Sequence, residues 1–188
     1  MLIEAVILAA GFSSRAKSYK MTLKVREKTV IERAIESMLN VSSRVIVVGG
    51  YKIEKLKPII NRYKNVELIF NENFQEGMFS SVKKGFSHIK GDSFFFMPGD
   101  YPLIDDKVCL KLLKHRENEI VIPTYNGKKG HPILMKSYLA KELLQSSKYS
   151  NLREFINTKK PIFIPVENEG ILLDIDTMED YKRILALS

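Results

Sequence analysis

The alternation of short apolar runs with amphipathic segments constrains the fold of this chain more than any other feature of its sequence. Apolar, largely β-branched or aromatic runs predict strands over residues 2–8, 44–48, 66–70, 93–97 and 120–122. Between them, apolar residues at helical spacing predict helices over residues 30–39, 53–63, 80–89 and 105–115. Strands that alternate with helices pair in parallel, with helices on both faces of the sheet. We therefore predict an α/β fold, a Rossmann-like three-layer α/β/α arrangement around a mainly parallel sheet.

The rhythm of the sequence changes after residue 126. Gly127-Lys128-Lys129-Gly130 predicts a turn. Short strands are then predicted over 131–135, 162–166 and 171–175, and helices over 138–145, 152–156 and 178–185. No repeat, low-complexity stretch or linker separates this region from the first. For 188 residues we predict a single domain, 1–188, in which the second region extends the same sheet.

Composition narrows the class of function. The formal net charge of +8 favours anionic ligands, but the lysines are spread along the whole chain, so nucleic acid is not indicated. The single Cys109 excludes an internal disulfide and a multi-cysteine metal site. Glu4 interrupts the apolar start, and no apolar run is long enough to cross a bilayer. We expect a cytoplasmic protein with neither a nucleic-acid nor a membrane partner.

The loop after the first predicted strand carries the strongest functional signal. Its sequence is Leu8-Ala9-Ala10-Gly11-Phe12-Ser13-Ser14-Arg15, with Lys20 further on. Such a turn presents backbone N–H donors that bind anions, and Arg15 and Lys20 add cationic donors suited to several phosphates. The spacing matches neither the dinucleotide fingerprint nor the P-loop. The alternative is an ordinary strand-to-helix turn with both cations on the surface.

Carboxylates follow two later segments. Asp100 lies in Met97-Pro98-Gly99-Asp100-Tyr101-Pro102, and a second group is Asp174-Ile175-Asp176-Thr177. Mg²⁺ needs only one or two carboxylates when phosphates supply its other ligands. Open α/β sheets bind ligands beyond the carboxyl ends of their strands, where the Gly11 loop, Asp100 and Asp174 are all predicted to fall. The alternatives are a common Gly-Asp turn and a helix cap at Asp176 or Thr177.

These motifs resemble those of the MobA-like nucleotidyltransferases, most closely the molybdenum cofactor cytidylyltransferase branch. The loop is similar to the family signature Leu-Ala-Ala-Gly-x-Ser-x-Arg-x-x-x-x-Lys, and the Asp100 segment to its Gly-Asp-x-Pro motif. The Asp174 segment is similar to Asp-Ile-Asp-Thr-Pro-Glu-Asp, with Met178 in place of proline. The resemblance implies a fold of the nucleotide-diphospho-sugar transferase type. It further implies a nucleotide-binding half over about residues 1–125, and an acceptor-binding half and sheet extension over about 126–188.

The resemblance also implies roles for single residues. Arg15, Lys20 and Asp100 are the implied catalytic residues, and Asp100 and Asp174 are the implied metal ligands, while we expect Asp176 to cap the last helix. The implied nucleotide-binding residues are Leu8, Ala9, Ala10, Gly11, Ser13, Asn71, Gly77, Ser80 and Ser81.

Two of these assignments have structural alternatives. Ser80 and Ser81 are equally suited to be ordinary helix N-caps. His131, in the family-like segment Gly130-His131-Pro132, is the implied acceptor-binding residue, although a lone histidine is usually structural. The chief departure from the family is Ala16-Lys17, where relatives have Met-Gly, so the loop backbone there is expected to differ.

The implied reaction is the Mg²⁺-dependent transfer of CMP from CTP to the phosphate of molybdopterin, with release of pyrophosphate. A molybdoenzyme that receives the product is a candidate partner. One alternative is a nucleotidyltransferase for a sugar or alditol phosphate, although those relatives usually have glycine where Ser13 stands. Another is a non-catalytic nucleotide- or cofactor-binding module.

Overall fold

Three neighbouring parallel strands form the centre of the sheet in the computed structural model, which describes residues 2–12 and 19–188. β1 (Ile3–Ala9) lies between β4 (Arg44–Gly49) and β6 (Ser93–Pro98) and pairs with both in parallel. β5 (Val66–Phe70) continues the sheet in parallel beside β4. This arrangement confirms the predicted parallel core.

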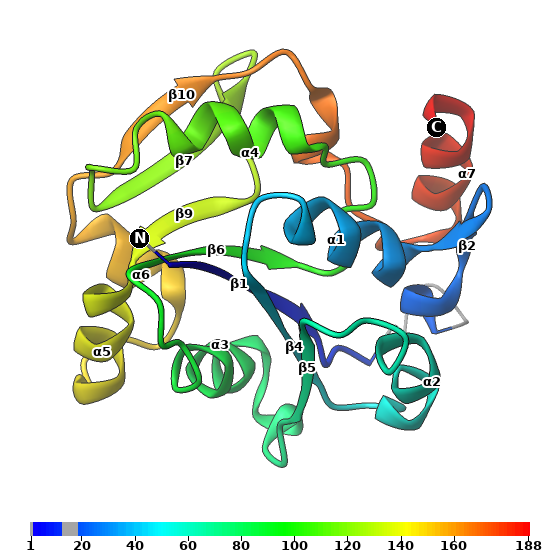
Figure 1. The fold of residues 1–188 in the computed structure, drawn as a ribbon, viewed down its shortest axis with the longest axis horizontal. Helices are drawn as coiled ribbons and strands as arrows, with labels where there is room; N and C mark the ends of the chain where they lie inside the picture. Colours follow the sequence, from blue (N-terminus) through cyan, green and yellow to red (C-terminus); the bar gives the residue numbers. More distant parts are fainter. Residues whose placement is uncertain (1, 13–18) are drawn as a thin grey trace.

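The second region extends the same sheet rather than forming a separate one (Figure 1). β9 (Ile133–Lys136) is inserted between β6 and β7 (Ile120–Tyr125) and runs antiparallel to both. β10 (Ile162–Pro165) pairs in parallel with β7. β8 (Lys128–Lys129), within the predicted turn, pairs with β7. Among the described residues the strand order is β10-β7-β9-β6-β1-β4-β5, so the sheet is mainly parallel, as predicted.

Helices cover both faces of the sheet, which confirms the three-layer architecture (Figure 1). Alternate residues of β1 point to opposite faces, so Ile7 and Leu8 belong to different apolar clusters. The Ile7 cluster receives side chains from α1 (Val30–Leu39), α2 (Lys57–Ile60) and α4 (Asp106–Leu113). The Leu8 cluster receives them from α3 (Met78–Phe86), α5 (Ser137–Gln145) and α6 (Leu152–Asn157).

Two predicted elements are wrong. The predicted helix 53–63 is a 3₁₀ turn, Ile53–Lys55, followed by the short α2, because Pro58 has no N–H and lies in the first turn of a new helix. The predicted strand 171–175 is replaced at its start by the 3₁₀ turn Glu169–Leu172. There Gly170 packs against the Leu103 carbonyl so closely that an added Cβ would lie 2.5 Å from that oxygen.

Sequence periodicity missed one hairpin, β2 (Lys24–Val25) with β3 (Lys28–Thr29), whose strands are too short to show alternation. The last helix, α7 (Met178–Leu187), lies beside it (Figure 1), and the Tyr181 hydroxyl donates to the Lys24 carbonyl at 2.5 Å. In the described part of the chain, no helix combines the length and apolarity needed to cross a membrane.

Candidate active site

The carboxyl ends of the central strands bring the predicted loop and the first predicted carboxylate together. Because β1 and β6 are parallel neighbours, Leu8 lies opposite Pro98. The Gly99 N–H then donates to the Leu8 carbonyl at 2.8 Å, which holds Asp100 beside the start of the loop. The register of β1 and β6 therefore places Asp100 next to the predicted loop.

Lys20 makes an ion pair with Asp100 at the end of this loop. Its Nζ lies 2.5 Å from Asp100 Oδ2 and 3.3 Å from Asp176 Oδ1. The Lys20 and Asp100 side chains are each only 12% exposed, which reduces screening by water. Burial by itself lowers the pKa of Lys20, but the two carboxylates outweigh it and raise the pKa above its ordinary value. Lys20 therefore carries its positive charge at neutral pH.

Three carboxylates converge at this point. Oxygen atoms of Asp100, Asp174 and Asp176 all lie within 4.8 Å of one another. Burial and then repulsion from the other two carboxylates raise the pKa of Asp174. Asp100 Oδ1 is buried and has no hydrogen-bond partner among the described residues. A cluster with excess negative charge and an unsatisfied carboxylate oxygen is suited to a divalent cation.

The expectation that Asp176 caps the last helix is wrong. Thr177 is the N-cap of α7: its side chain accepts from the Asp180 N–H, and Asp180 bonds back to the Thr177 N–H at 2.7 Å. This reciprocal capping box uses Thr177 and Asp180, and the Asp176 carboxylate accepts from Lys20 instead. Both Asp174 and Asp176 are thus placed beside Asp100, and either is close enough to share an ion with it.

A cavity of about 260 Å³ opens next to Lys20 and Asp100. Its lining contains several of the residues predicted to bind nucleotide, drawn from two separate stretches of the chain. These are Leu8, Ala10 and Gly11 from the first loop, and Gly77 and Ser81 from the start of α3. Lys20 and Asp100, two of the predicted catalytic residues, line it as well. The structure therefore brings the predicted loop, the α3 segment and the ion pair together around one space.

Of the predicted nucleotide-binding residues that the structure describes, three do not line this cavity. Ala9 points to the opposite face of the sheet, into the Ile7 cluster. Asn71 is 2% exposed and donates to both Ser80 Oγ and Ser81 Oγ, at 2.8 and 2.9 Å. Ser80 in turn donates to nearby carbonyls. Asn71 and Ser80 thus hold the start of α3 in place behind the cavity wall.

Neither serine of this segment is the N-cap of α3, since that position is Gly77. Ser13 and Arg15, and the Ala16-Lys17 departure from the family pattern, lie outside the described residues. Their predicted roles stay predictions.

His131 lines a different, larger cavity of about 660 Å³ between α3 and α6. The two cavities share Met78, so they are neighbours. The imidazole packs against Tyr101, with ring centroids 5.0 Å apart, and its Nδ1 is buried without a hydrogen-bond partner in the described residues. Burial lowers the pKa of His131 to about 4. At neutral pH the side chain is therefore an uncharged group on an apolar cavity wall.

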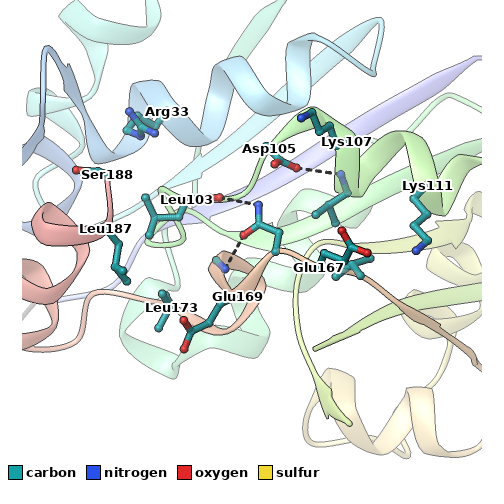
Figure 2. Close-up of a pocket in the computed structure, with 14 residues that line it drawn as sticks. Arg33, Leu103, Asp105, Lys107, Lys111, Glu167, Glu169, Leu173, Leu187 and Ser188 are labelled. Carbon is teal, nitrogen blue, oxygen red and sulfur yellow. Dashed lines mark hydrogen bonds between the residues drawn. The ribbon is translucent and has the colours of Figure 1, made fainter. Parts of the chain in front are cut away.

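A larger cavity, about 770 Å³, lies elsewhere, between α4, the Glu169–Leu172 turn and the end of α7 (Figure 2). None of the predicted site residues lines it. Several of its polar groups already serve the fold: Asp105 caps α4, and Glu169 pairs with Arg183. Size alone therefore does not identify the functional site.

The sequence-based reasoning missed the aromatic wall of the small cavity. Phe12 and Phe74 both line it, and their ring centroids are 5.4 Å apart. Phe12 occupies a variable position of the loop motif, and Phe74 lies in an irregular segment after β5, so no periodicity or motif marks either residue. Only the fold brings them together.

Comparison with known proteins agrees with this geometry. The model of the MobA-like NTP transferase domain matches residues 5–162. The chain belongs to the MobA-like NTP transferase family. It is a nucleotidyltransferase, and it is 30% identical over 179 residues to the molybdenum cofactor cytidylyltransferase of Escherichia coli, covering 95% of this chain and 93% of that protein. It is also 25% identical to a probable molybdenum cofactor guanylyltransferase of Aquifex aeolicus, covering 96% and 89%.

Solved structures share the fold of this family member. A nucleotidyl transferase from Methanothermobacter thermautotroptrophicus superposes with a TM-score of 0.87 at 19% identity, covering 99% of this chain and 97% of that one. A Mycobacterium tuberculosis protein, determined in complex with manganese, superposes with a TM-score of 0.77 at 18% identity, covering 98% of each chain.

Proposed function

We propose that the protein transfers CMP from CTP to the phosphate of molybdopterin or the molybdenum cofactor and releases pyrophosphate. The cavity beside Lys20 and Asp100 supports a nucleotide donor, and the neighbouring cavity at His131 supports an acceptor. The Escherichia coli relative supports the choice of base and acceptor. On this proposal one domain acts in the cytoplasm, with its halves divided near residue 125, and a molybdoenzyme receives the product.

The carboxylate cluster fits Mg²⁺. Asp100 and Asp174 would hold the ion, with Asp176 as the alternative to Asp174, and the unpartnered Asp100 Oδ1 is the oxygen that most needs a cation. Bound there, Mg²⁺ would offset charge on the triphosphate and polarise its phosphoryl oxygens.

The protein's own groups act on the reaction by position and charge. An oxygen of the acceptor phosphate bonds to the α-phosphorus of CTP while the bond to the bridging oxygen breaks and pyrophosphate leaves. Lys20, protonated beside Asp100, offsets the negative charge that builds on these phosphates. Arg15 is proposed to do the same. A phosphate monoester with a second pKa near ~6 is already ionised at neutral pH, so the attack requires no general base.

The observation that carries this proposal is that the Lys20–Asp100 pair lines a cavity beside the loop, and that Asp100 is also one of the three converging carboxylates. A module that only binds nucleotide has little need for three converging carboxylates, because their mutual repulsion costs stability. A sugar or alditol phosphate acceptor uses the same cluster, so the acceptor has to be decided by assay.

The test is a pyrophosphate-release assay in which CTP or GTP is combined with molybdopterin, a sugar phosphate or an alditol phosphate, with and without Mg²⁺. We expect release with CTP, molybdopterin and Mg²⁺ together. Release only with a sugar or alditol phosphate would transfer the proposal to that acceptor. CTP binding without release for any acceptor would support the non-catalytic alternative.

Asp100→Asn tests the site itself. The substitution keeps the shape of the side chain but removes the charge, so we expect kcat to fall roughly 100-fold or more while the fold is kept. The matched control is Asp92→Asn, an exposed aspartate just before the same strand β6. Wild-type Mg²⁺-dependent turnover in Asp100→Asn would place the metal site elsewhere.

A further inference from the structure

Asn168 connects, by hydrogen bonds, the segment after Asp100 with the segment before Asp174. Its Nδ2 donates to the Leu103 carbonyl at 3.2 Å, and its Oδ1 accepts from the Gly170 N–H at 2.6 Å. Figure 2 draws both hydrogen bonds of Asn168 as dashed lines, in the region between the labelled residues Leu103 and Glu169. Because the side-chain amide uses both its ends on backbone groups, Asn168 acts on the fold of the chain rather than on a ligand.

The hydrogen bonds of Asn168 join two segments that lie close in sequence to the carboxylates. Leu103 follows Asp100 by three residues, and Gly170 precedes Asp174 by four. Gly170 itself approaches the Leu103 carbonyl too closely for any side chain. At the other end of the same segment, the Ile175 N–H donates to the Asp100 carbonyl at 3.1 Å. The segment from 168 to 176 is thus attached to the Asp100 loop at both ends.

Three carboxylates that face one another push these two segments apart unless other contacts hold them. Lys20 offsets part of that repulsion from the loop side, through Asp100 and Asp176. Asn168 opposes this repulsion from the other side of the two segments. Its hydrogen bonds lie on the wall of the 770 Å³ cavity and not among the carboxylates. Loss of the amide would leave the Ile175 bond and the Gly170 contact to hold the spacing.

We propose that Asn168 is a positioning residue that sets the distance of Asp174 and Asp176 from Asp100 and thereby the affinity of the cluster for a divalent cation. This inference rests on the proposed function, in which the cluster binds metal. Residues that orient carboxylate ligands from behind typically change metal affinity 10- to 100-fold when they are removed.

The experiment titrates the full chain with Mn²⁺, without nucleotide, and follows free Mn²⁺ by electron paramagnetic resonance. We expect Asn168→Ala to bind Mn²⁺ about 10-fold more weakly than the wild type, and to need about 10-fold more Mg²⁺ for half-maximal pyrophosphate release. The matched control is Asn118→Ala. Asn118 Nδ2 also donates to a backbone carbonyl, that of His115 at 3.0 Å, but beyond the end of α4.

An isosteric variant separates position from folding. Asn168→Asp keeps an oxygen for the Gly170 N–H but places a second oxygen opposite the Leu103 carbonyl, so it should weaken Mn²⁺ binding as Asn168→Ala does, and it decides the question if the alanine variant fails to fold. Variants within twofold of wild-type Mn²⁺ affinity would overturn the role of Asn168 and leave the proposed function standing. A wild type that neither binds Mn²⁺ nor releases pyrophosphate with Mg²⁺ would overturn both.

Discussion

At the scale of single residues, Ala10 is tightly packed in the wall of the small cavity beside Lys20 and Asp100. Its side chain is 6% exposed and lines the cavity, and a Cβ placed on Gly50 would lie 2.9 Å from the Ala10 methyl and 2.6 Å from Phe74. Backbone, methyl and ring are therefore close-packed here, and such contacts resist any increase in volume. We therefore expect the size of the side chain at position 10 to limit the size of the nucleotide base that the cavity accepts.

Ala10→Gly is expected to raise kcat/KM for GTP about 10-fold relative to CTP, without fully reversing the preference, because one methyl group is worth roughly 1–3 kcal/mol of discrimination. The measurement is the CTP/GTP ratio of kcat/KM with molybdopterin as acceptor. Ala9→Gly is the control, since the Ala9 methyl points to the other face of the sheet. A wild type that prefers GTP would contradict the choice of donor, and an unchanged ratio in Ala10→Gly would contradict the steric argument.

At the scale of elements, one tyrosine joins the two described ends of the first loop. Tyr51, which follows β4, packs against Phe12 at 5.4 Å and against Tyr19 at 6.5 Å between ring centroids. Its N–H donates to the Ala10 carbonyl at 3.4 Å. Tyr19 is buried, donates its hydroxyl to the Ala9 carbonyl and directly precedes Lys20. Tyr51 is therefore expected to align both the cavity wall and Lys20, the proposed catalytic lysine.

Removing this ring should affect nucleotide binding more than acceptor binding. We expect Tyr51→Leu to raise KM for CTP about 10-fold, since two aromatic contacts are lost, and to leave KM for the acceptor nearly unchanged. Tyr51→Phe keeps both contacts and should restore KM. Tyr63→Leu, at a partly buried tyrosine beyond α2, serves as the matched control for lost aromatic volume. Equal changes in both KM values would indicate a general loss of structure instead.

Elements with a strong local pattern could be predicted from sequence, and elements made by distant contacts could not. The predicted bounds 30–39 and 66–70 match α1 and β5. In contrast, the predicted strand 171–175 fails because Asn168 and Gly170 turn the chain against Leu103, which is distant in sequence. A pattern of apolar residues gives no information about a contact with a residue that is distant in sequence.

The same distinction applies to the candidate site. Lys20, Asp100 and Asp174 could be predicted because short motifs mark them, and the structure brings their segments together. The pairing of Lys20 with Asp176 was not predicted, because the sequence-based expectation made Asp176 the helix cap, whereas Thr177 occupies that position. Phe12 and Phe74 carry no motif at all. Motifs therefore identify the charged groups, while the shape of the cavity has to be taken from the fold.

At the scale of the whole molecule, the two ends of the parallel strands differ in what their buried charges do. The carboxyl ends hold the carboxylate cluster with an unsatisfied oxygen. At the amino end of β1, Glu4 is 1% exposed and satisfied: it accepts from the Lys90 and Gly91 N–H groups at 2.6 and 2.7 Å and from Arg44 at 2.8 Å. We infer that Glu4 serves stability alone.

That inference predicts a specific pH dependence. Burial by itself raises the pKa of Glu4, but the Gly91 and Lys90 N–H groups and the Arg44 guanidinium outweigh it and lower the pKa below its ordinary value. A carboxyl whose pKa is lower in the folded than in the unfolded state stabilises the fold above the unfolded pKa, and this stabilisation is lost as the pH falls through the folded pKa.

Glu4→Gln should therefore lower the free energy of unfolding by about 3 kcal/mol at neutral pH, because Arg44 and two backbone donors lose a buried charged partner. The difference from wild type should stay constant between about pH 7 and the ordinary glutamate pKa of 4.5, and it should shrink as the pH falls below that value and wild-type Glu4 becomes protonated. Urea denaturation followed by circular dichroism across this range measures it. Glu67→Gln, at the 47% exposed partner of the same Arg44, should cost only about 0.5 kcal/mol. At urea concentrations below the unfolding transition, kcat/KM of Glu4→Gln should equal that of the wild type, since Glu4 and Asp100 lie at opposite ends of the parallel strands. A loss of stability that does not depend on pH would show that Glu4 does not act in this way. A loss of kcat/KM in the folded variant would show the same.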